Sequence, residues 1–238
     1  SRAAPQAPSA PSARWALASL SLAMLLSSLG TSIANVGLPT LARAFNAPFQ
    51  QVQWVVLAYL LATTTLVVSA GRLGDMVGRR RLLLAGIALF TLASVLCGMA
   101  PTLGLLIAAR ALQGLGAAVM MALTMALVAQ AVPQDKTGSA MGLLGTVSAI
   151  GTALGPSLGG LLIAGVGWQA LFFINLPLGL LAFFLAYHTL RADGPKAGRL
   201  GFDYLGTLLL ALTLAAYALA MTLGLGRWGL LNAALLLA

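Results

Sequence analysis

The amino-acid sequence predicts an all-α membrane protein, and three observations support this fold class. Of the 238 residues, 60% are hydrophobic and only 7% are charged, whereas soluble domains carry about 25% charged residues. The few charges are separated by uncharged segments at least as long as the ~20 apolar residues that cross a bilayer as a helix. Strand-like alternation is absent, and the segments exceed the ~10 residues of a transmembrane strand. The composition therefore argues against a soluble enzyme or nucleic-acid-binding protein.

The uncharged segments predict the helices in order. Segments of 28 residues lie at 15–42, 44–71 and 82–109, and segments of 24 and 23 residues lie at 111–134 and 204–226. Residues 137–190 form a 54-residue segment that holds two helices, because the Gly165-Val166-Gly167 turn divides it. The predicted helices are 15–37, 51–70, 82–100, 103–131, 138–164, 168–190 and 204–224, followed by a truncated eighth helix.

Four regions follow from these helices. Residues 1–14 are rich in Ala, Pro and Ser, which predicts a flexible cytoplasmic tail. Residues 15–190 predict a six-helix bundle, residues 191–203 a cytoplasmic linker, and residues 204–238 an extra seventh helix with part of an eighth. Because the chain begins with Ser1 and ends inside an apolar run, we expect a fragment of a longer membrane protein.

The distribution of charge predicts the orientation. If the N-terminus is cytoplasmic, Arg43 and Arg227 lie outside and Arg110 lies within the membrane, which leaves the other ten of the 13 Lys and Arg inside. This bias predicts a multi-pass protein of the cell membrane with a cytoplasmic N-terminus. The basic excess then reflects topology, so we expect the lipid bilayer and not a nucleic acid as a partner. One Cys excludes a disulfide framework or a Cys-rich metal site, and no metal site is expected.

Residues 71–81 combine glycine with a concentration of charge. The segment contains three glycines, one acid and four arginines: Gly71, Gly74, Gly78, Asp75, Arg72, Arg79, Arg80 and Arg81. This pattern predicts a tight turn between two spans. Arginines alone would suffice as an anchor on the inner side, so the acid and the glycines indicate a further role.

Helix 103–131 carries a charge at membrane depth. An Arg there costs roughly 2.5–3.5 kcal/mol on insertion scales and normally faces a cavity or a partner. Gln113 lies one turn from Arg110 on the same face, where it can share the Arg donors, and Gly114 and Gly116 follow. The alternative is that Arg110 extends its side chain to the outer membrane surface.

Helix 138–164 contains a regular series of small residues. The series consists of Gly142, Gly151, Gly155, Pro156, Gly159 and Gly160. Such a series predicts a groove where helices approach closely, in a helix that the proline weakens and allows to bend. The alternative is an ordinary helix that packs through small residues.

These three stretches resemble signature motifs of the major facilitator superfamily of secondary transporters. Residues 71–80 match its loop pattern G-x-L-x-D-x-x-G-R-R, residues 110–118 match R-x-x-Q-G-x-G-A-A, and residues 142–160 match the antiporter pattern G-x8-G-x3-G-P-x2-G-G of drug-exporting members. The resemblance implies a six-helix N-terminal bundle of two inverted three-helix repeats, with the C-terminal half of the transporter missing. It also implies a cytoplasmic gating loop at residues 71–80 and a buried coupling charge at Arg110.

Residues 29–39, 168–179 and 203–206 are similar to the corresponding stretches of the fourteen-helix EmrB/QacA-type drug exporters. One position departs from that pattern, because Gly30 stands where the branch has an Asp in its first helix. The predicted spans contain no Asp or Glu, so His188 is their only candidate for binding a proton. The coupling ion therefore stays open.

From the resemblance we expect a secondary active transporter and not an enzyme. It would export drugs or other small amphipathic molecules by alternating access, as proton-coupled antiport driven by a gradient and without a cofactor. Asn35, Trp54 and Tyr59, with Arg110 and Gln113, are candidates for lining the small-molecule cavity, because polar and aromatic groups at membrane depth tend to face one. A same-fold importer of a metabolite and a non-transporting half-transporter are the alternatives, and the oligomeric state is not determined.

Overall fold

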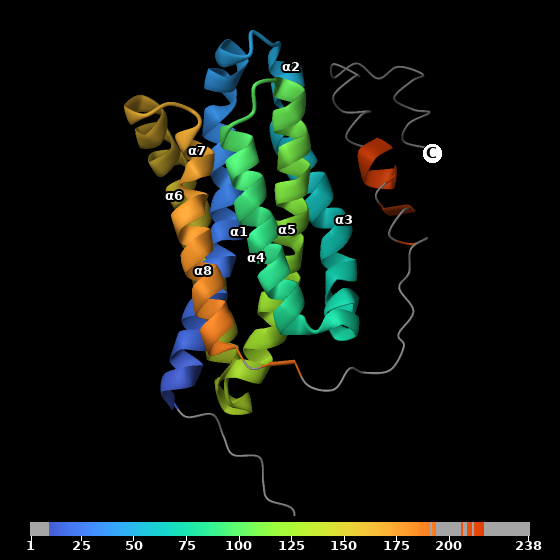
Figure 1. Cartoon of the computed structure of the whole chain (residues 1–238), viewed down its shortest axis with the longest axis vertical. Coiled ribbons are helices and arrows are strands. Elements are labelled where there is room, and N and C mark those ends of the chain that lie inside the picture. The colour runs from blue at the N-terminus through green and yellow to red at the C-terminus, as the bar shows by residue number, and fades with distance from the viewer. Residues whose placement is uncertain (1–9, 191, 194–205, 207–208, 211, 217–238) are drawn as a thin grey trace, which may run out of the picture.

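The computed structural model describes residues 10–190, 192–193, 206, 209–210 and 212–216. Its elements in chain order are α1 (Ala10–Ala44), α2 (Phe49–Val52), α3 (Trp54–Val77), α4 (Arg79–Gly98), α5 (Leu103–Ala131), the 3-10 helix η1 (Gln134–Lys136), α6 (Thr137–Gly165), α7 (Ala170–Phe173) and α8 (Asn175–Thr189). The long helices run alongside one another as a bundle (Figure 1). Six segments in this part of the chain are long and apolar enough to cross a membrane, so the predicted all-α fold with six spans up to residue 190 is confirmed.

The observed helix ends differ most from the predicted ones at both ends of the first span and at the end of the second. α1 begins at Ala10 and continues through Pro39 to Ala44, so residues 10–14 belong to a helix and not to the predicted tail. α3 continues seven residues past its predicted end at residue 70, to Val77. Helix 103–131 is reproduced to the residue.

The last described span, Ala170–Thr189, agrees with the predicted helix 168–190 and has one irregularity at Ile174, whose backbone angles stay helical at φ −58° and ψ −27°. α7 ends at Phe173, and α8 begins at Asn175. Pro177 lies in the first turn of α8 and has no N–H to donate to the Phe173 carbonyl four residues earlier. The missing hydrogen bond explains the irregularity between α7 and α8.

The contacts between helices repeat between the first three spans and the last three. α5 packs against α3 and α4, and α1 packs against α6 and α8. The first three spans correspond in order to the last three: α1 to α5, α3 to α6 and α4 to α8. Under this correspondence the α3–α5 contact matches α1–α6, and the α4–α5 contact matches α1–α8. The α1–α5 and α4–α8 contacts match themselves. Because each unit has three spans, the second enters the membrane from the opposite side. The pattern supports the two predicted inverted repeats.

Burial distinguishes central from peripheral helices. In α1 and in α5, 61% of the most apolar 18-residue stretch is buried inside the protein. The corresponding fraction is 22% in the span that contains α3 and 17% in the span that contains α6. The core therefore lies between α1, α4, α5 and α8, and α3 and α6 have a large uncovered apolar surface.

The predicted seventh helix, residues 204–224, falls largely outside the described residues. Within it, residues 206, 209–210 and 212–216 are helical. The predicted eighth helix and residues 194–203 of the predicted linker also lie outside the described part of the chain.

Candidate functional site

The glycine- and arginine-rich segment is a helix end and not the predicted loop. Residues 71–77 form the last two turns of α3, and α4 begins at Arg79, so Gly78 is the only residue between the two helices. Gly78 has a φ of 110°, in the left-handed region that glycine adopts without steric cost. We call this one-residue connection the α3–α4 turn. Gly74 is buried against Leu123 of α5, whereas Gly71 borders open space and Arg72 is exposed.

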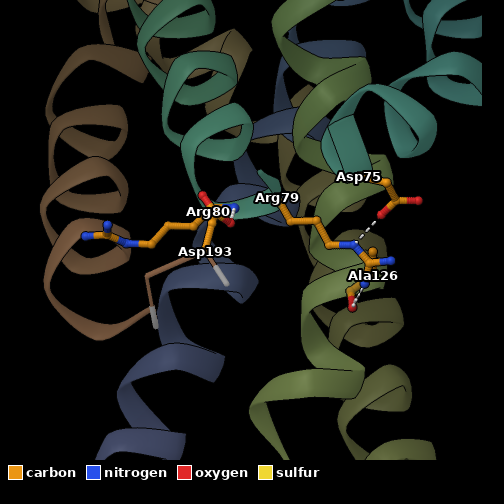
Figure 2. Close-up of polar contacts among 5 residues, drawn as sticks. All are labelled: Asp75, Arg79, Arg80, Ala126 and Asp193. Carbon is orange, nitrogen blue, oxygen red and sulfur yellow. Dashed lines mark hydrogen bonds and ion pairs between the residues drawn. The ribbon is translucent and has the colours of Figure 1, made fainter. Parts of the chain in front are cut away.

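Asp75 forms an ion pair with Arg79 across the α3–α4 turn. The carboxylate Oδ1 lies 2.9 Å from Nε of Arg79, and both side chains are about one third exposed, at 35% and 33%. The Arg79 guanidinium also donates to the Ala126 carbonyl of α5 at 3.5 Å (Figure 2). Arg79 therefore connects the end of α3, the beginning of α4 and the side of α5.

A second carboxylate, from Asp193, binds the beginning of α4 from the other side. Its two oxygens accept hydrogen bonds from the backbone N–H groups of Arg80 at 2.8 Å and Arg81 at 3.1 Å. The Arg80 side chain points away from Arg79 (Figure 2), toward Tyr187 of α8, whose ring centroid lies 5.1 Å from the guanidinium carbon. From the sequence, Asp193 counted only as an acid on the inner side. Its one local signal is its position directly after a span.

Arg110 lies in the interior of the bundle and does not extend to the membrane surface. Its side chain is fully buried, with 0% exposure. Nε donates to the Val55 carbonyl at 2.9 Å, Nη2 donates to the Gly30 carbonyl at 3.2 Å, and Nη1 donates to Oε1 of Gln113. The guanidinium carbon lies 4.2 Å from the Tyr59 ring centroid. All these partners are neutral, so backbone dipoles and a ring face stabilise the charge.

The Arg110 hydrogen bonds continue through Gln113 to a fourth helix. Nε2 of Gln113 donates to the Ser94 hydroxyl of α4 at 2.6 Å, and Ser94 donates to the Phe90 carbonyl at 2.8 Å. The Tyr59 hydroxyl donates to the Ser27 carbonyl of α1 at 2.9 Å. Side chains from α3, α4 and α5 and carbonyls of α1 thus form one polar network in the core, which we call the Arg110 network.

The two glycines that follow Gln113 allow two helices to approach α5 closely. A Cβ at Gly114 would collide with the Tyr59 backbone of α3. A Cβ at Gly116 would lie 2.7 Å from the Phe90 nitrogen and 2.8 Å from the Gly86 carbonyl of α4. Small residues permit such approach in membrane helices, and here the approach keeps Tyr59 beside Arg110.

The glycine series of α6 divides into two groups. Gly151, Gly155 and Gly159 repeat every four residues, are buried and face α1. Gly142 and Gly160 border open space, and Pro156 is exposed. Two hydrogen bonds accompany the buried group: the Ser28 and Ser148 hydroxyls lie 2.7 Å apart, and Ser32 donates to the Thr152 carbonyl at 2.7 Å.

The three candidate cavity residues differ in burial. Asn35 is exposed on α1, where its amide donates to the Thr31 carbonyl at 3.3 Å. Trp54 is half-buried at the beginning of α3. Tyr59 is fully buried, so it lines no open cavity in this structure and the prediction for it is corrected. Its ring packs on Arg110 because α3 and α5 are in close contact at Gly114.

Comparisons with known proteins are consistent with this architecture. The profile of the Major Facilitator Superfamily matches residues 20–203. Multidrug resistance protein Stp of Mycobacterium tuberculosis is 39% identical over 204 residues, which are 85% of this chain and 38% of Stp. Riboflavin transporter RibZ of Clostridioides difficile is 38% identical over 200 residues, 84% of this chain and 44% of RibZ. Methylenomycin A resistance protein of Streptomyces coelicolor is 32% identical over 209 residues, 87% of this chain and 44% of that protein.

A solved structure shares the fold. The bacterial homolog of the human lysosomal transporter Spinster, in its inward-facing and occupied conformation, matches with a TM-score of 0.70 at 18% identity, over 96% of this chain and 58% of that chain. The chain spans less than half the length of Stp, RibZ and the methylenomycin A resistance protein.

Proposed function

This chain belongs to the Major Facilitator Superfamily, and from that membership we propose that it is the N-terminal half of an exporter of drugs or other small amphipathic molecules. The chain is a membrane-embedded transporter polypeptide and not an enzyme. The observation that carries the proposed direction is its similarity to two relatives that are named for drug resistance. The proposed location is the cell membrane, with the N-terminus in the cytoplasm, where the positive-inside rule places most of the Lys and Arg.

In the proposed mechanism the bundle moves as a unit against a second bundle. The Arg110 network supports this role, because it links α1, α3, α4 and α5 through side-chain hydrogen bonds. The contact between α1 and α6 rests on small residues instead, next to the proline of α6. We propose that α6 bends or shifts along α1 while the other helices keep their packing. The uncovered faces of α3 and α6 are the proposed surface toward the second bundle.

The driving force is proposed to be a proton gradient, without a bound cofactor. Gly30 bears on this point, since its carbonyl accepts from Arg110 and a Cβ there would lie 3.0 Å from the Phe90 ring and 3.5 Å from the Tyr59 hydroxyl. A carboxylate at position 30 would therefore project into the Arg110 network. Because this chain has glycine there, we propose that the proton-binding acid lies in the rest of the transporter. The alternative is that an ion other than the proton drives transport.

An importer of a metabolite is a second candidate function, favoured by the 38% identity to a riboflavin transporter. The proposed small-molecule partner would then be a polar, aromatic metabolite. A half-transporter without transport activity is the third possibility, and both are distinguished from export by transport assays on the full-length protein.

The test uses inverted membrane vesicles that contain the full-length protein, energised by respiration. We expect accumulation of the fluorescent dye ethidium, abolished by a protonophore and absent from vesicles without the protein. Riboflavin uptake by intact cells without dye accumulation in vesicles would contradict export and favour the importer. Absence of both activities from correctly inserted protein would contradict a transport function for these substrates.

A further inference from the structure

We propose that Asp193 is a positioning residue for transport, which fixes the beginning of the predicted linker to the first turn of α4 and thereby to the Asp75–Arg79 pair. This inference rests on the transport function proposed above. It differs from the roles implied for residues 71–80 by the family resemblance, because Asp193 lies outside that motif and follows the last span of the bundle.

The hydrogen bonds of Asp193 satisfy the exposed end of α4. The first N–H groups of a helix have no partner within the helix, and a negative charge is favoured beside them. Oδ1 and Oδ2 of Asp193 bind two successive groups of this kind, at Arg80 and Arg81, with distances of 2.8 and 3.1 Å. These N–H groups are 113 and 112 residues away along the chain, so the interaction is a tertiary cap and not part of a local turn.

Gly78 provides the space in which Asp193 lies. A Cβ at Gly78 would collide with the Asp193 carboxylate, coming within 2.6 Å of its Cγ. The backbone of Gly78 also has a φ of 110°. The same glycine therefore forms the one-residue α3–α4 turn and leaves room for the Asp193 carboxylate.

Two arginines connect this position to the rest of the bundle. Arg79, next to Gly78, pairs with Asp75 and reaches the Ala126 carbonyl of α5. Arg80 reaches the Tyr187 carbonyl and ring of α8. Figure 2 shows Asp193 beside the beginning of α4, with Arg79 and Arg80 pointing in opposite directions. A displacement of the residues that follow α8 would therefore act directly on the α3–α4 turn.

The experiment compares Asp193→Ala, Asp193→Asn and Asp135→Ala in the full-length protein. Asp135 is an exposed acid in η1 and serves as the matched control. The first readout is limited trypsin digestion of detergent-purified protein, with cleavage after Lys196 and Arg199 followed by mass spectrometry. The second is the concentration dependence of ethidium efflux in vesicles, which separates maximal rate from KM.

Loss of a helix cap shifts the equilibrium between the linker attached to α4 and the released linker by roughly fivefold. The rate of proteolysis follows the released population when release is rapid. We therefore expect Asp193→Ala to be cleaved about fivefold faster than the wild type. We also expect a lower maximal efflux rate with KM unchanged, because the released linker no longer positions the α3–α4 turn. Asp193→Asn, which keeps one cap oxygen, should recover part of both losses, and Asp135→Ala should resemble the wild type.

Each other outcome contradicts the proposal at an identified step. Unchanged cleavage of Asp193→Ala would show that Asp193 does not hold the linker. Faster cleavage with a wild-type efflux rate would show that the attachment exists but does not serve transport. Absence of efflux from the wild-type protein would contradict the proposed function itself and with it the positioning role. The cleavage ratio would still decide whether the attachment exists.

Discussion

The Ser32 hydroxyl of α1 donates a hydrogen bond of 2.7 Å to the Thr152 carbonyl of α6. Thr152 lies four residues before Pro156, which has no N–H and cannot form the helical bond to that carbonyl. The neighbouring helix thus supplies the donor that the proline lacks. Gly155 makes the approach possible, since a Cβ there would collide with the Ser32 side chain. The weak point of α6 and its contact with α1 are therefore the same feature.

Replacing Ser32 with Ala should destabilise the α1–α6 contact. The Thr152 carbonyl would lose its donor, and interhelical hydrogen bonds in membrane proteins contribute about 0.6 kcal/mol on average and up to about 2 kcal/mol. We expect a lower apparent melting temperature of the detergent-purified full-length protein. A double-mutant cycle with Pro156→Ala provides the control, because this substitution restores a backbone N–H four residues after Thr152. An equal effect of Ser32→Ala with and without Pro156 would contradict the assignment.

The α6 glycines should respond differently to Ala according to the helix face on which they lie. Gly155→Ala forces α1 and α6 apart, and such overpacking costs about 1–3 kcal/mol. Gly142 and Gly160 border open space in this chain, so Gly160→Ala and Gly142→Ala leave the α1–α6 contact unchanged and should cost less than Gly155→Ala. Thermal melting and efflux of the three variants test this. Equal losses at Gly155 and Gly160 would contradict the special role of the α1–α6 contact at Gly155.

Arg110→Lys and Arg110→Met should both reduce efflux about tenfold or more. A single ammonium cannot reach Gly30, Val55 and Gln113 together, and leaving a buried polar group without its partner costs about 1–3 kcal/mol. Initial efflux rates at matched expression measure the effect, with exposed Arg43→Ala as the control. Normal efflux by both variants would exclude Arg110 from the transport mechanism.

Asp75→Asn should reduce export while membrane insertion and stability stay close to the wild type. The pair with Arg79 is about one third exposed, and exposed i,i+4 pairs contribute only about 0.3–0.5 kcal/mol. A loss of efflux without a loss of melting temperature would therefore indicate a gating role. Unchanged efflux in vesicles would contradict that role.

Asn175→Leu should stabilise the protein. Asn175 is fully buried at the beginning of α8, and neither amide atom has a hydrogen-bond partner among the described residues. A buried polar group without a partner costs about 1–3 kcal/mol, and Leu has a similar shape without that cost. We expect a higher melting temperature, while Asn35→Leu on the exposed face of α1 should change it little. A lower melting temperature for Asn175→Leu would show that the amide is hydrogen-bonded in solution.

Much of the fold could be predicted because its signals are local. Apolar length and the charges between segments identified the six spans, and the ends of helix 103–131 were predicted to the residue. The end of α3 was not predicted correctly, because Gly71 and Gly74 resemble turn residues in the sequence. Both lie within the helix, where Gly74 packs against α5. The irregularity at Ile174 depends on one absent N–H, at Pro177.

The candidate site was predicted residue by residue but not in its connections. The sequence drew attention to Arg110 and Gln113, and the structure adds Tyr59 as a ring beneath the guanidinium. Tyr59 had been assigned to the cavity because an aromatic residue at membrane depth has two possible environments that one sequence does not distinguish. Asp193 could not be recognised, because its partners are backbone N–H groups and every helix begins with such groups.

The sequence by itself determined the membrane class, the number of spans up to residue 190 and the family motifs, because hydrophobic length, charge placement and glycine spacing are properties of short segments. Only the tertiary structure decided what the charges do. Arg110 binds carbonyls that are 55 and 80 residues away along the chain, and Asp193 caps a helix that begins more than 100 residues before it. Such contacts depend on which helices pack together, and in a membrane that packing is decided by small residues and shape.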